Sequence, residues 1–512
     1  MKKIDVYKKF KYLFIIWIAF FSLGLVRKSF QNDTFYTIKI GELIIKNGID
    51  MLDHFSIHSN LLYTYPHWLY DVFIYTIYNH FGYLGIYIST IILLIILLLI
   101  VFKINLLVCN KNYFLGALCI IIEGLAISGF ATARAQLVSF ILFAIQIYFI
   151  ETFLKNGKKK YLLGLLLISL LLCNVHVAVW PFYFIIYLPY LAEYLVSIIV
   201  SKIKFKKENK FIKYLKSRII IERNNNIKYL FITMLLSIFT GLITPIHDTP
   251  YTYLIKTMLG STQKYIKEHQ MITWADSPFT IIIAGETLFL AFLSKIKLRD
   301  LFMVSGLSLM SILSIRHIAL LALIGTICFC RTFSLFFENF NIDINKKIFP
   351  FFTKKYGIAI SFIIVIIFSS LMFMHENKKE YIEKKLYPVD AVKYIKENIN
   401  IKEMRLFNDY DFGSYLILNN IPIFIDSRAD LYTKEFSGLD YDIFLDYEFI
   451  ARNYQEKFNF YNISHVLIYK ENNPLYSLIK HDDNYKTLYE DKNFIFYEKL
   501  DNPNYFVTFE YN

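Results

Sequence analysis

About eleven apolar segments run through this sequence, and each is long enough to cross roughly 30 Å of hydrocarbon as an α-helix. Hydrophobic residues make up 56% of the chain and the mean hydropathy is +0.42, which is too apolar for a soluble globular protein of this length. The sequence therefore predicts a polytopic α-helical membrane protein. The predicted spans are 12–29, 83–107, 113–131, 136–154, 161–177, 179–201, 229–246, 278–295, 301–315, 318–335 and 356–376.

Lysine-rich segments alternate with the spans and predict the topology. By the positive-inside rule such segments stay in the cytoplasm, which places the N-terminus there as well. The odd number of spans then leaves residues 377–512 outside the cytoplasm. The first span is not a cleavable signal, because Arg27-Lys28 follows it and further spans come after. The lysine-rich segments are the N-terminal stretch with Lys2 and Lys3, Lys155–Lys160, Lys202–Lys228, Lys295–Arg299 and the stretch ending at Lys354-Lys355.

The charge balance needs no nucleic acid as a partner. The net charge of +13 comes from 55 Lys and Arg against 42 Asp and Glu, and the excess is concentrated in the segments predicted to be cytoplasmic. All five cysteines lie in or beside spans, so neither a disulfide framework nor a thiolate metal site is indicated. The predicted location is the plasma membrane, with the lipid bilayer as surroundings.

Two domains are predicted. Residues 1–376 form the transmembrane domain, whose first extracytoplasmic loop, 30–82, carries two interfacial helices, one ending at Asn47-Gly48 and one running from Pro66 to Gly82. Residues 377–512 form a small extracytoplasmic α/β domain. Its predicted elements are helices at Pro388–Ile399 and Tyr447–Tyr461, strands at Met404–Phe407, Ile421–Ile425 and His465–Tyr469, and a hairpin of Tyr485–Tyr489 with Phe494–Tyr497.

Ionisable residues near the spans gather at the face opposite the lysine-rich segments. A charged side chain at the centre of a bilayer costs about 2.5 to 3.5 kcal/mol on insertion scales, so such residues normally line a water-filled cavity or a site. The outer face is therefore predicted to carry the chemistry. The residues are Asp33, Asp53, His67, Arg134, His176, Arg316 and His317.

Asp33 is the first acidic residue after the first span. A carboxylate held at a membrane-exit cavity can accept a proton from an incoming hydroxyl or amine, which is the work of a general base. The structural alternative is a helix N-cap, because Asp followed by Thr-Phe-Tyr opens an interfacial helix well. Both roles fit the sequence.

Four cationic or imidazole side chains are predicted to stabilise an anionic phosphate. As structural alternatives, each could be an interfacial side chain that extends to water. Their predicted convergence on one face favours the phosphate site. They are Arg134, His176, Arg316 and His317.

Two pairs in the first loop, each of an acidic residue and a histidine, are candidates to bind a divalent cation as a cofactor. They are Asp53-His54 and His67 with Asp71, and a structural role in the loop is the preferred interpretation. Their spacing names no metal type, and Asp53 and His67 are weak metal candidates.

Short motifs along most of the chain resemble those of the GT-C superfamily of integral-membrane glycosyltransferases, in particular bacterial members with an extracytoplasmic C-terminal domain. The first part of the chain contributes Asp33 with Gly41-Glu42, Asp53-His54-Phe55-Ser56, His67-Trp68-Leu69, Arg134-Ala135-Gln136 and Asn174-Val175-His176. The rest contributes Thr244-Pro245, Trp274 to Pro278, Arg316-His317, Gly413-Ser414-Tyr415-Leu416 and the run from Phe424 through Asp426-Ser427-Arg428-Ala429-Asp430.

The resemblance implies a transferase that moves a sugar from a polyprenyl-phosphate donor to an acceptor of the cell envelope, outside the cytoplasm, by a single inverting displacement. It implies Asp33 as the catalytic base and places the four phosphate candidates near the lipid phosphate. Ala135, Thr244 and His317 depart from the family's pattern, which bears on phosphate coordination more than on the fold. Further candidates for substrate or loop contacts are Asp53, His54, His67, Asp71, Trp274 and Arg428.

The loop around Arg428 follows a predicted buried strand, where α/β sheets place ligand loops. An ion pair from Arg428 to Asp430, holding the loop against the membrane domain, fits equally well.

Two other functions fit the same outer face. A transporter or flippase of an anionic lipid-linked intermediate would use a cationic cavity, although transporters usually show repeated halves and charges near the midplane, and neither is found here. A non-catalytic membrane assembly protein would use the C-terminal domain to bind a partner.

Overall fold

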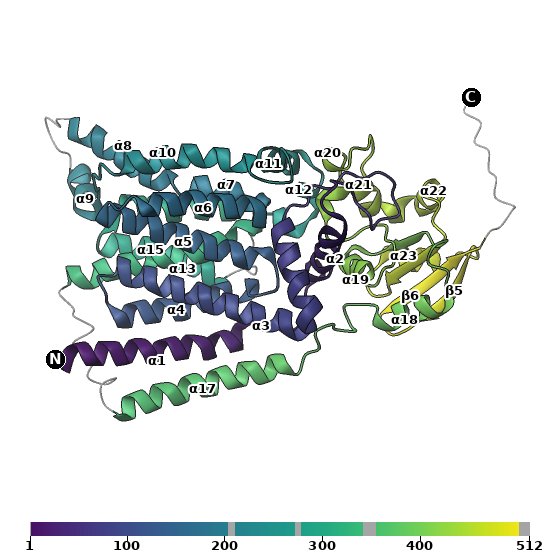
Figure 1. Ribbon diagram of the computed structural model, residues 1–512, viewed down its shortest axis with the longest axis horizontal. Helices are drawn as coiled ribbons and strands as arrows, with labels where there is room; N and C mark the ends of the chain where they lie inside the picture. The colour runs from purple at the N-terminus through teal and green to yellow at the C-terminus, as the bar shows by residue number, and fades with distance from the viewer. Residues whose placement is uncertain (1, 203–209, 272–277, 341–354, 501–512) are drawn as a thin grey trace.

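The apolar segments form a helical bundle that occupies one end of an elongated molecule, with a smaller α/β region at the other end (Figure 1). The computed structural model describes residues 2–202, 210–271, 278–340 and 355–500. Five helical stretches are long and apolar enough to cross a membrane, and shorter apolar helices accompany them. The protein is therefore a mainly helical membrane protein. The five stretches are Trp68–Val108, Tyr113–Phe130, Ala135–Asn156, Val177–Lys202 and Ile315–Asn339.

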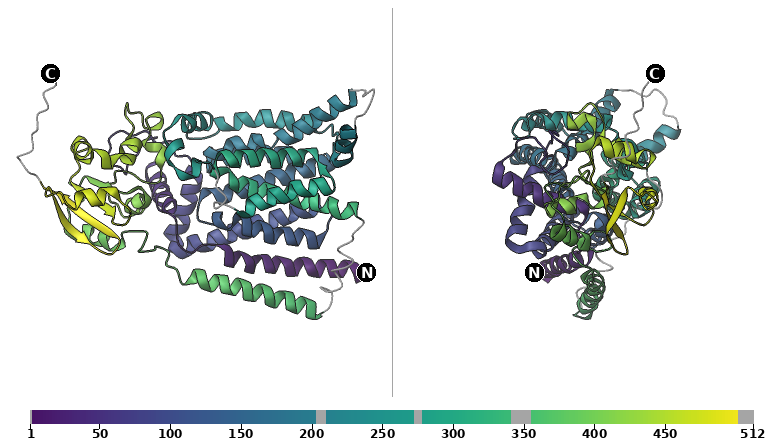
Figure 2. Two further views of the ribbon diagram at one scale, coloured as in Figure 1. Left: turned by 180° about the vertical axis from the view of Figure 1, so that it is seen from behind. Right: turned by 90° about the vertical axis from the view of Figure 1, so that its right-hand side faces the viewer.

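Each of the eleven predicted spans coincides with one helix or with consecutive helices. The bundle consists of α1 (Lys2–Leu25), α3 (Trp68–Val108), α4 (Tyr113–Ile127), α5 (Ala135–Asn156), α6 (Lys160–Val175), α7 (Trp180–Ile185), α8 (Leu188–Lys202), α10 (Ile227–Ser237), α13 (Pro278–Leu293), α14 (Leu298–Leu313), α15 (Ile318–Asn339) and α17 (Lys355–Asn377). The short helix α9 (Lys210–Arg218) and the two-residue strands β1 (Ile219–Ile220) and β2 (Ile296–Lys297) lie between bundle helices in the sequence. Helices α1 and α17 lie side by side at one edge (Figures 1 and 2).

Helices are present at both segments that were predicted to be interfacial, at the end of the bundle that meets the α/β region. Helix α2 (Asn32–Asn47) ends before Gly48, and α3 begins two residues after Pro66. Helix α3 is broken at Gly82, where the backbone φ is 60°, a value that glycine adopts without strain. Helix α2 packs closely on α3, since a Cβ added at Gly41 would lie 2.1 Å from the carbonyl oxygen of Asp71. Glycine at position 41 thus fixes how α2 covers the end of the bundle.

The α/β region is built on a four-stranded sheet of order β3-β4-β6-β5. Strands β3 (Leu406–Asn408) and β4 (His465–Tyr469) are parallel, whereas β6 (Phe494–Lys499) is antiparallel to β4 and to β5 (Tyr485–Glu490). The helices of this region are α18 (Val389–Asn398), α19 (Gly413–Leu418), α20 (Lys434–Ser437), α21 (Ile443–Glu448), α22 (Tyr454–Phe460) and α23 (Pro474–Ile479). The helix at 388–399, the strands near 404–407 and at 465–469 and the closing hairpin are confirmed.

Two predictions for this region are wrong. Ile421–Ile425 is buried but is not a strand of the sheet, because Ile423 bonds through its backbone with Phe55 and Ile57 of the first loop instead. The helix predicted over 447–461 is broken: α21 ends at Glu448, and α22 starts only after Asn453.

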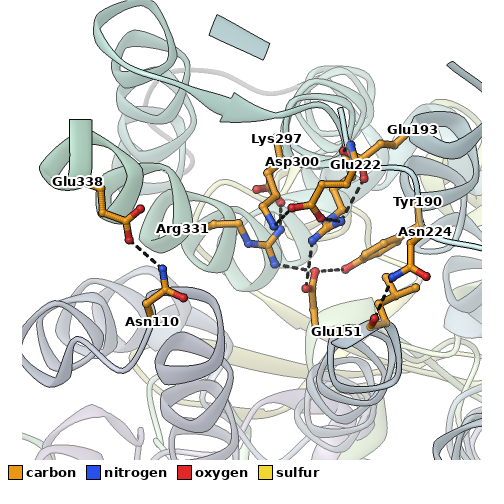
Figure 3. A network of polar contacts seen from close by, with 12 residues as sticks. Asn110, Glu151, Tyr190, Glu193, Glu222, Asn224, Lys297, Asp300, Arg331 and Glu338 are labelled. Carbon is orange, nitrogen blue, oxygen red and sulfur yellow. Dashed lines mark hydrogen bonds and ion pairs between the residues drawn. The ribbon is translucent and has the colours of Figure 1, made fainter. Parts of the chain in front are cut away.

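A network of ion pairs, buried except at Glu222, joins α5, α8, α14 and α15 (Figure 3). It lies at the end of the bundle away from the α/β region (Figure 1). Glu151 lies near the C-terminal end of α5. At ~1.5 Å per residue it is about 24 Å along the helix from Ala135, the first residue of α5. Arg299 and Arg331 are both less than a tenth exposed. The pairs are Arg299 with Glu151 (3.4 Å), Glu193 (3.1 Å) and Glu222 (2.9 Å), and Arg331 with Glu151 (2.6 Å) and Asp300 (2.6 Å).

Candidate active site

A cavity of about 650 Å³ lies where the bundle meets the α/β region; we call it the junction cavity. Its walls come from α2, from the starts of α5 and α15, and from the 3₁₀ turns Lys267–His269 and Ile315–His317. The α/β region closes the cavity through the loop 426–430 and α21. A concave site at the meeting point of two structural units is a usual place for a ligand.

Asp33 and Arg134 form the central ion pair of the junction cavity. The carboxylate Oδ2 of Asp33 lies 2.5 Å from Nη2 of Arg134, and the two side chains remain 20% and 31% exposed. Asp33 stands in the first turn of α2, whose N-cap is Gln31, so the capping role proposed as an alternative for Asp33 is not what the structure shows. The carboxylate is instead open to the cavity and oriented by a guanidinium.

The turn Lys267–His269 lies beside Arg134 and Arg316 in the wall of the cavity. Glu268 Oε1 lies 3.6 Å from Arg134 Nη1, and Arg316 Nη1 lies 3.3 Å from Nε2 of His269. Burial lowers the pKa of His269, and the nearby charge of Arg316 lowers it further, so the imidazole is neutral and accepts the hydrogen bond from Arg316. Among the described residues, no carboxylate forms an ion pair with Arg316, which leaves its charge available to an anion.

A chain of hydrogen bonds links α2 to the start of α3. His67 Nδ1 lies 3.2 Å from Asp71 Oδ1, and its Nε2 lies 3.2 Å from the hydroxyl of Tyr36. The buried carboxylate fixes the proton on Nδ1, so that Nε2 accepts from Tyr36. His176 lies beside this chain, with its ring centroid 5.8 Å from that of His67, and its Nδ1 bonds with Ser139 at 3.0 Å.

The junction cavity brings together most of the predicted site residues. Asp71 is buried behind His67 and does not line the cavity, and His54 is exposed and pairs with Asp50 at 2.6 Å. Trp274 lies outside the described residues. The predicted residues that line the cavity are Asp33, His67, Arg134, His176, Arg316, His317 and Arg428.

The side chains do not fit a divalent cation at the two candidate residues. The carboxylate of Asp53 accepts a hydrogen bond from Arg428. Both ring nitrogens of His67 are already hydrogen-bonded, one to Asp71 and the other to Tyr36. Among the described residues, no three His, Cys, Asp or Glu side chains are grouped to hold a metal ion.

The loop 426–430 holds the α/β region to the bundle, but through different pairs from the one predicted. Arg428 does not pair with Asp430: it contacts Asp53 at 2.6 Å and Asp426 at 2.9 Å. Asp430 instead accepts hydrogen bonds from the hydroxyls of Tyr253 (2.8 Å) and Thr262 (3.0 Å). These belong to α11 (Thr249–Leu259) and α12 (Thr262–Tyr265). The loop thus joins two separate walls of the junction cavity.

Sequence reasoning missed Tyr36, Glu268 and His269. Tyr36 lies three residues after Asp33 on α2, so its position on the same helical face was a usable signal. Glu268 and His269 come from a connecting segment with no motif of its own, and only the fold places them beside Arg134 and Arg316.

No protein-family model and no curated protein matches the sequence. Among solved structures, the oligosaccharyltransferase AglB of Archaeoglobus fulgidus in complex with an inhibitory peptide and a dolichol-phosphate superposes with a TM-score of 0.56 at 10% identity, over 89% of this chain and 69% of that chain. Its apo form gives 0.55 at 11% identity, over 90% and 69%. The chain has a GT-C fold. It is the fold that the resemblance of the motifs predicted.

A second solved structure spans nearly the whole of both chains. ArnT of Cupriavidus metallidurans bound to undecaprenyl phosphate covers 95% of this chain and 97% of its own, at 10% identity and a TM-score of 0.48.

Proposed function

We propose that this GT-C protein is a membrane glycosyltransferase that takes a sugar from a polyprenyl-phosphate donor and attaches it to an acceptor of the cell envelope. The observation that carries the proposal is the junction cavity, where the open carboxylate of Asp33 lies among cationic and imidazole side chains. The archaeal structure with the same fold carries a dolichol-phosphate, which supports a lipid-phosphate donor.

Different side chains of the cavity act on the acceptor and on the leaving group. Asp33 takes the proton of the acceptor hydroxyl or amine as that group attacks the anomeric carbon of the donor. The bond from the anomeric carbon to the phosphate oxygen breaks, and the polyprenyl phosphate leaves with the electron pair. Arg316, with His317 and His176 beside it in the cavity, stabilises the developing phosphate charge. A single displacement of this kind inverts the anomeric configuration.

Arg134 has a different part from Arg316. Its guanidinium is paired with Asp33 at 2.5 Å, so it holds the base in place. Arg316 has only the neutral His269 as a hydrogen-bond partner among the described residues, and its charge is the one left for the donor phosphate.

The topology completes the proposal. Eleven spans, with the N-terminus in the cytoplasm, place the junction cavity and residues 377–512 outside, so that residues 1–376 are the transmembrane domain and 377–512 an extracytoplasmic domain. The segregation of the lysine-rich segments from the cavity residues supports this arrangement.

The ion-pair network at the other end of the bundle favours a transferase over a transporter. Alternating access requires that end to open, which would separate Arg299 and Arg331 from their carboxylate partners. The partners of Arg331 are labelled in Figure 3. These ion pairs hold that end closed, and each of them would have to break when it opens. A transferase acting at the junction cavity can keep this end closed.

Turnover of the donor tests the function. The purified protein in lipid nanodiscs is given a panel of synthetic polyprenyl-phosphate hexoses, and release or transfer of the sugar and the anomeric configuration of the product are measured. We expect turnover with at least one donor, with inversion, and loss of turnover by about 10²-fold or more in Asp33→Asn. Asp440→Asn, at an exposed residue of the α/β region, is the matched control. Full activity of Asp33→Asn would refute the base assignment, and movement of intact donor across the bilayer without turnover would support the transporter.

A further inference from the structure

Helix α11 has its polar and apolar sides reversed for a helix in contact with water. Its buried side carries the hydroxyl groups of Thr249, Tyr253 and Thr257. A surface helix in water turns its apolar side to the core and its polar side outward. The medium outside α11 is therefore apolar. The exposed residues of α11 are all large and apolar: Leu254 (40%), Ile255 (60%), Met258 (67%) and Leu259 (70%).

The helical spacing separates the two sides of α11. Successive residues are ~100° apart around an α-helix, so residues 254, 255, 258 and 259 lie on one face, which we call the outer face. Residues 249, 253 and 257 follow one another at intervals of four and lie on the opposite, inner face. The outer face is thus an apolar stripe along one side of the helix.

Helix α11 is too short to span a membrane and lies at one end of the bundle. Its 11 residues extend about 16 Å at ~1.5 Å per residue, about half of the roughly 30 Å of hydrocarbon. It packs between the turn Val177–Val179 of the bundle and α20 of the α/β region (Figure 1). An amphipathic helix in this position lies at the boundary between lipid headgroups and acyl chains.

The preceding apolar segment ends where α11 begins. Along α10 and the 3₁₀ turn Ile238–Leu242, exposed apolar side chains such as Leu236, Phe239 and Leu242 form the surface of this segment. The hydroxyl of Tyr251 donates a 2.7 Å hydrogen bond to the carbonyl of Ile238 and fixes the first turn of α11 to this end. Helix α11 therefore starts at the depth where the lipid-facing surface of the segment ends.

The inner face of α11 holds the α/β region. Tyr253 and Thr257 donate to Oδ2 of Asp430 at 2.8 and 3.4 Å. The ring of Phe436 in α20 packs edge to face on Tyr253 at 5.1 Å, and Nζ of Lys256 lies 5.7 Å from the centroid of the same ring. Asp430 and Phe436 both line the junction cavity. The position of α11 therefore fixes part of the cavity wall.

We propose that α11 is a membrane anchor of the α/β region, with its outer face among the acyl chains of the leaflet on the α/β side of the bundle. Its inner face then holds the loop 426–430 at a fixed height above the lipid. A face about 16 Å long and about 10 Å wide is less than a quarter of the about 800 Å² that each partner buries in a stable protein interface. Lipid is accordingly the occupant, and not a second protein.

Spin labelling of the full-length protein in lipid nanodiscs measures the surroundings of the outer face. Nitroxides are placed at Met258→Cys and Leu259→Cys, and their collisions with oxygen, which concentrates among acyl chains, and with a water-soluble nickel chelate are compared. Leu235→Cys on α10 is the reference for lipid and Leu478→Cys on α23 the reference for water; both leucines are 42% exposed. The five native cysteines are buried, and the unsubstituted protein gives the background.

We expect the labels at 258 and 259 to collide more with oxygen than with the nickel chelate, as the label at 235 does, and the label at 478 to show the reverse. Labels that behave like the one at 478 would place the outer face in water and overturn the proposal. Labels that neither reagent reaches would mean that protein covers the face, a second copy or another chain, which also overturns it.

Hydrogen exchange tests the anchoring itself. Met258→Asp places a carboxylate on the outer face, where no contact with Asp430 is altered directly, and should draw α11 out of the lipid. We expect the amides of residues 426–436 to lose protection in this variant and to keep it in Leu478→Asp. Unchanged protection in Met258→Asp would refute the anchoring role. Neither measurement uses a donor, so the inference stands or falls independently of the proposed glycosyl transfer.

Discussion

Arg428 donates a 2.6 Å hydrogen bond from Nη1 to Asp53 Oδ1, and this contact joins two residues 375 positions apart in the sequence. Both side chains are almost fully buried, and the rings of Phe55 and Tyr63 lie over the guanidinium. Burial alone would raise the pKa of Asp53, but the charge of Arg428 and the hydrogen bonds from Arg428 and Ser56 together outweigh it, so the pKa lies below its ordinary value. Asp53 is therefore ionised and pins the first loop to the α/β region.

Arg428→Met is expected to destabilise the protein strongly, because it leaves the Asp53 carboxylate buried without its cation. Removing one partner of a buried pair costs about 3 to 5 kcal/mol. Thermal and chemical unfolding in detergent measure the loss. Lys384→Met is the control, since its pair with Asp390 is exposed and should contribute less than about 1 kcal/mol. Equal losses in the two variants would contradict the role given to Arg428.

Asp409 gives the α/β region a stability that declines as the pH rises. Burial raises the pKa of Asp409 to about 7, although its carboxylate accepts a 2.7 Å hydrogen bond from the backbone of Tyr469. The folded state therefore binds a proton that the unfolded state releases near pH 4, so this contribution is full below pH 4 and is lost between pH 4 and 7. Its size is on the order of 4 kcal/mol. In Asp409→Asn this decline should disappear from the pH dependence of the unfolding midpoint; an unchanged profile would refute the assignment.

His58 gives a slope of the opposite sign. It lies at the contact between the first loop and the α/β region, where Nε2 donates to the carbonyl of Phe424 at 2.8 Å, and burial lowers its pKa to about 4. Protonation is easier in the unfolded state, so stability is full above pH 6.5 and falls by on the order of 3 kcal/mol as the pH drops to 4. His58→Gln keeps a hydrogen-bond donor and cannot titrate. The unfolding midpoint should therefore fall less between pH 8 and pH 5 in this variant than in the wild type. Should the two proteins show the same profile, His58 does not titrate as described.

The parts of the fold that the sequence predicted are those with a local signal. Long apolar segments must form helices in lipid whatever surrounds them, and the glycine at 48 and the proline at 66 mark the end of α2 and the start of α3. The segment 421–425 carries the apolar pattern of a strand, but its backbone partner is the first loop, far away in the sequence, and no local rule foresees such a pairing. The break at Asn453 is likewise a departure from an otherwise helical pattern.

For the site, the sequence identified residues by type and predicted that they share one face, but it did not give their partners. Asp33, Arg134 and Arg316 do line one cavity. Tertiary packing decides the partner of each arginine. It pairs Arg134 with Asp33, places Arg316 beside a neutral histidine and brings Arg428 to the first loop. These pairings are what distinguish the role of one arginine from another.

The different partners of Arg134 and Arg316 predict different kinetic defects. Arg316→Lys keeps a positive charge but loses the planar, bidentate contact with a phosphate, so the KM for the polyprenyl-phosphate donor should rise about 10- to 100-fold while kcat changes less. Arg134→Lys releases the carboxylate of Asp33 from its 2.5 Å partner, so kcat should fall about tenfold or more with a smaller change in donor KM. Steady-state kinetics with varied donor separate the two. Interchanged defects would mean that Arg134, and not Arg316, holds the donor phosphate.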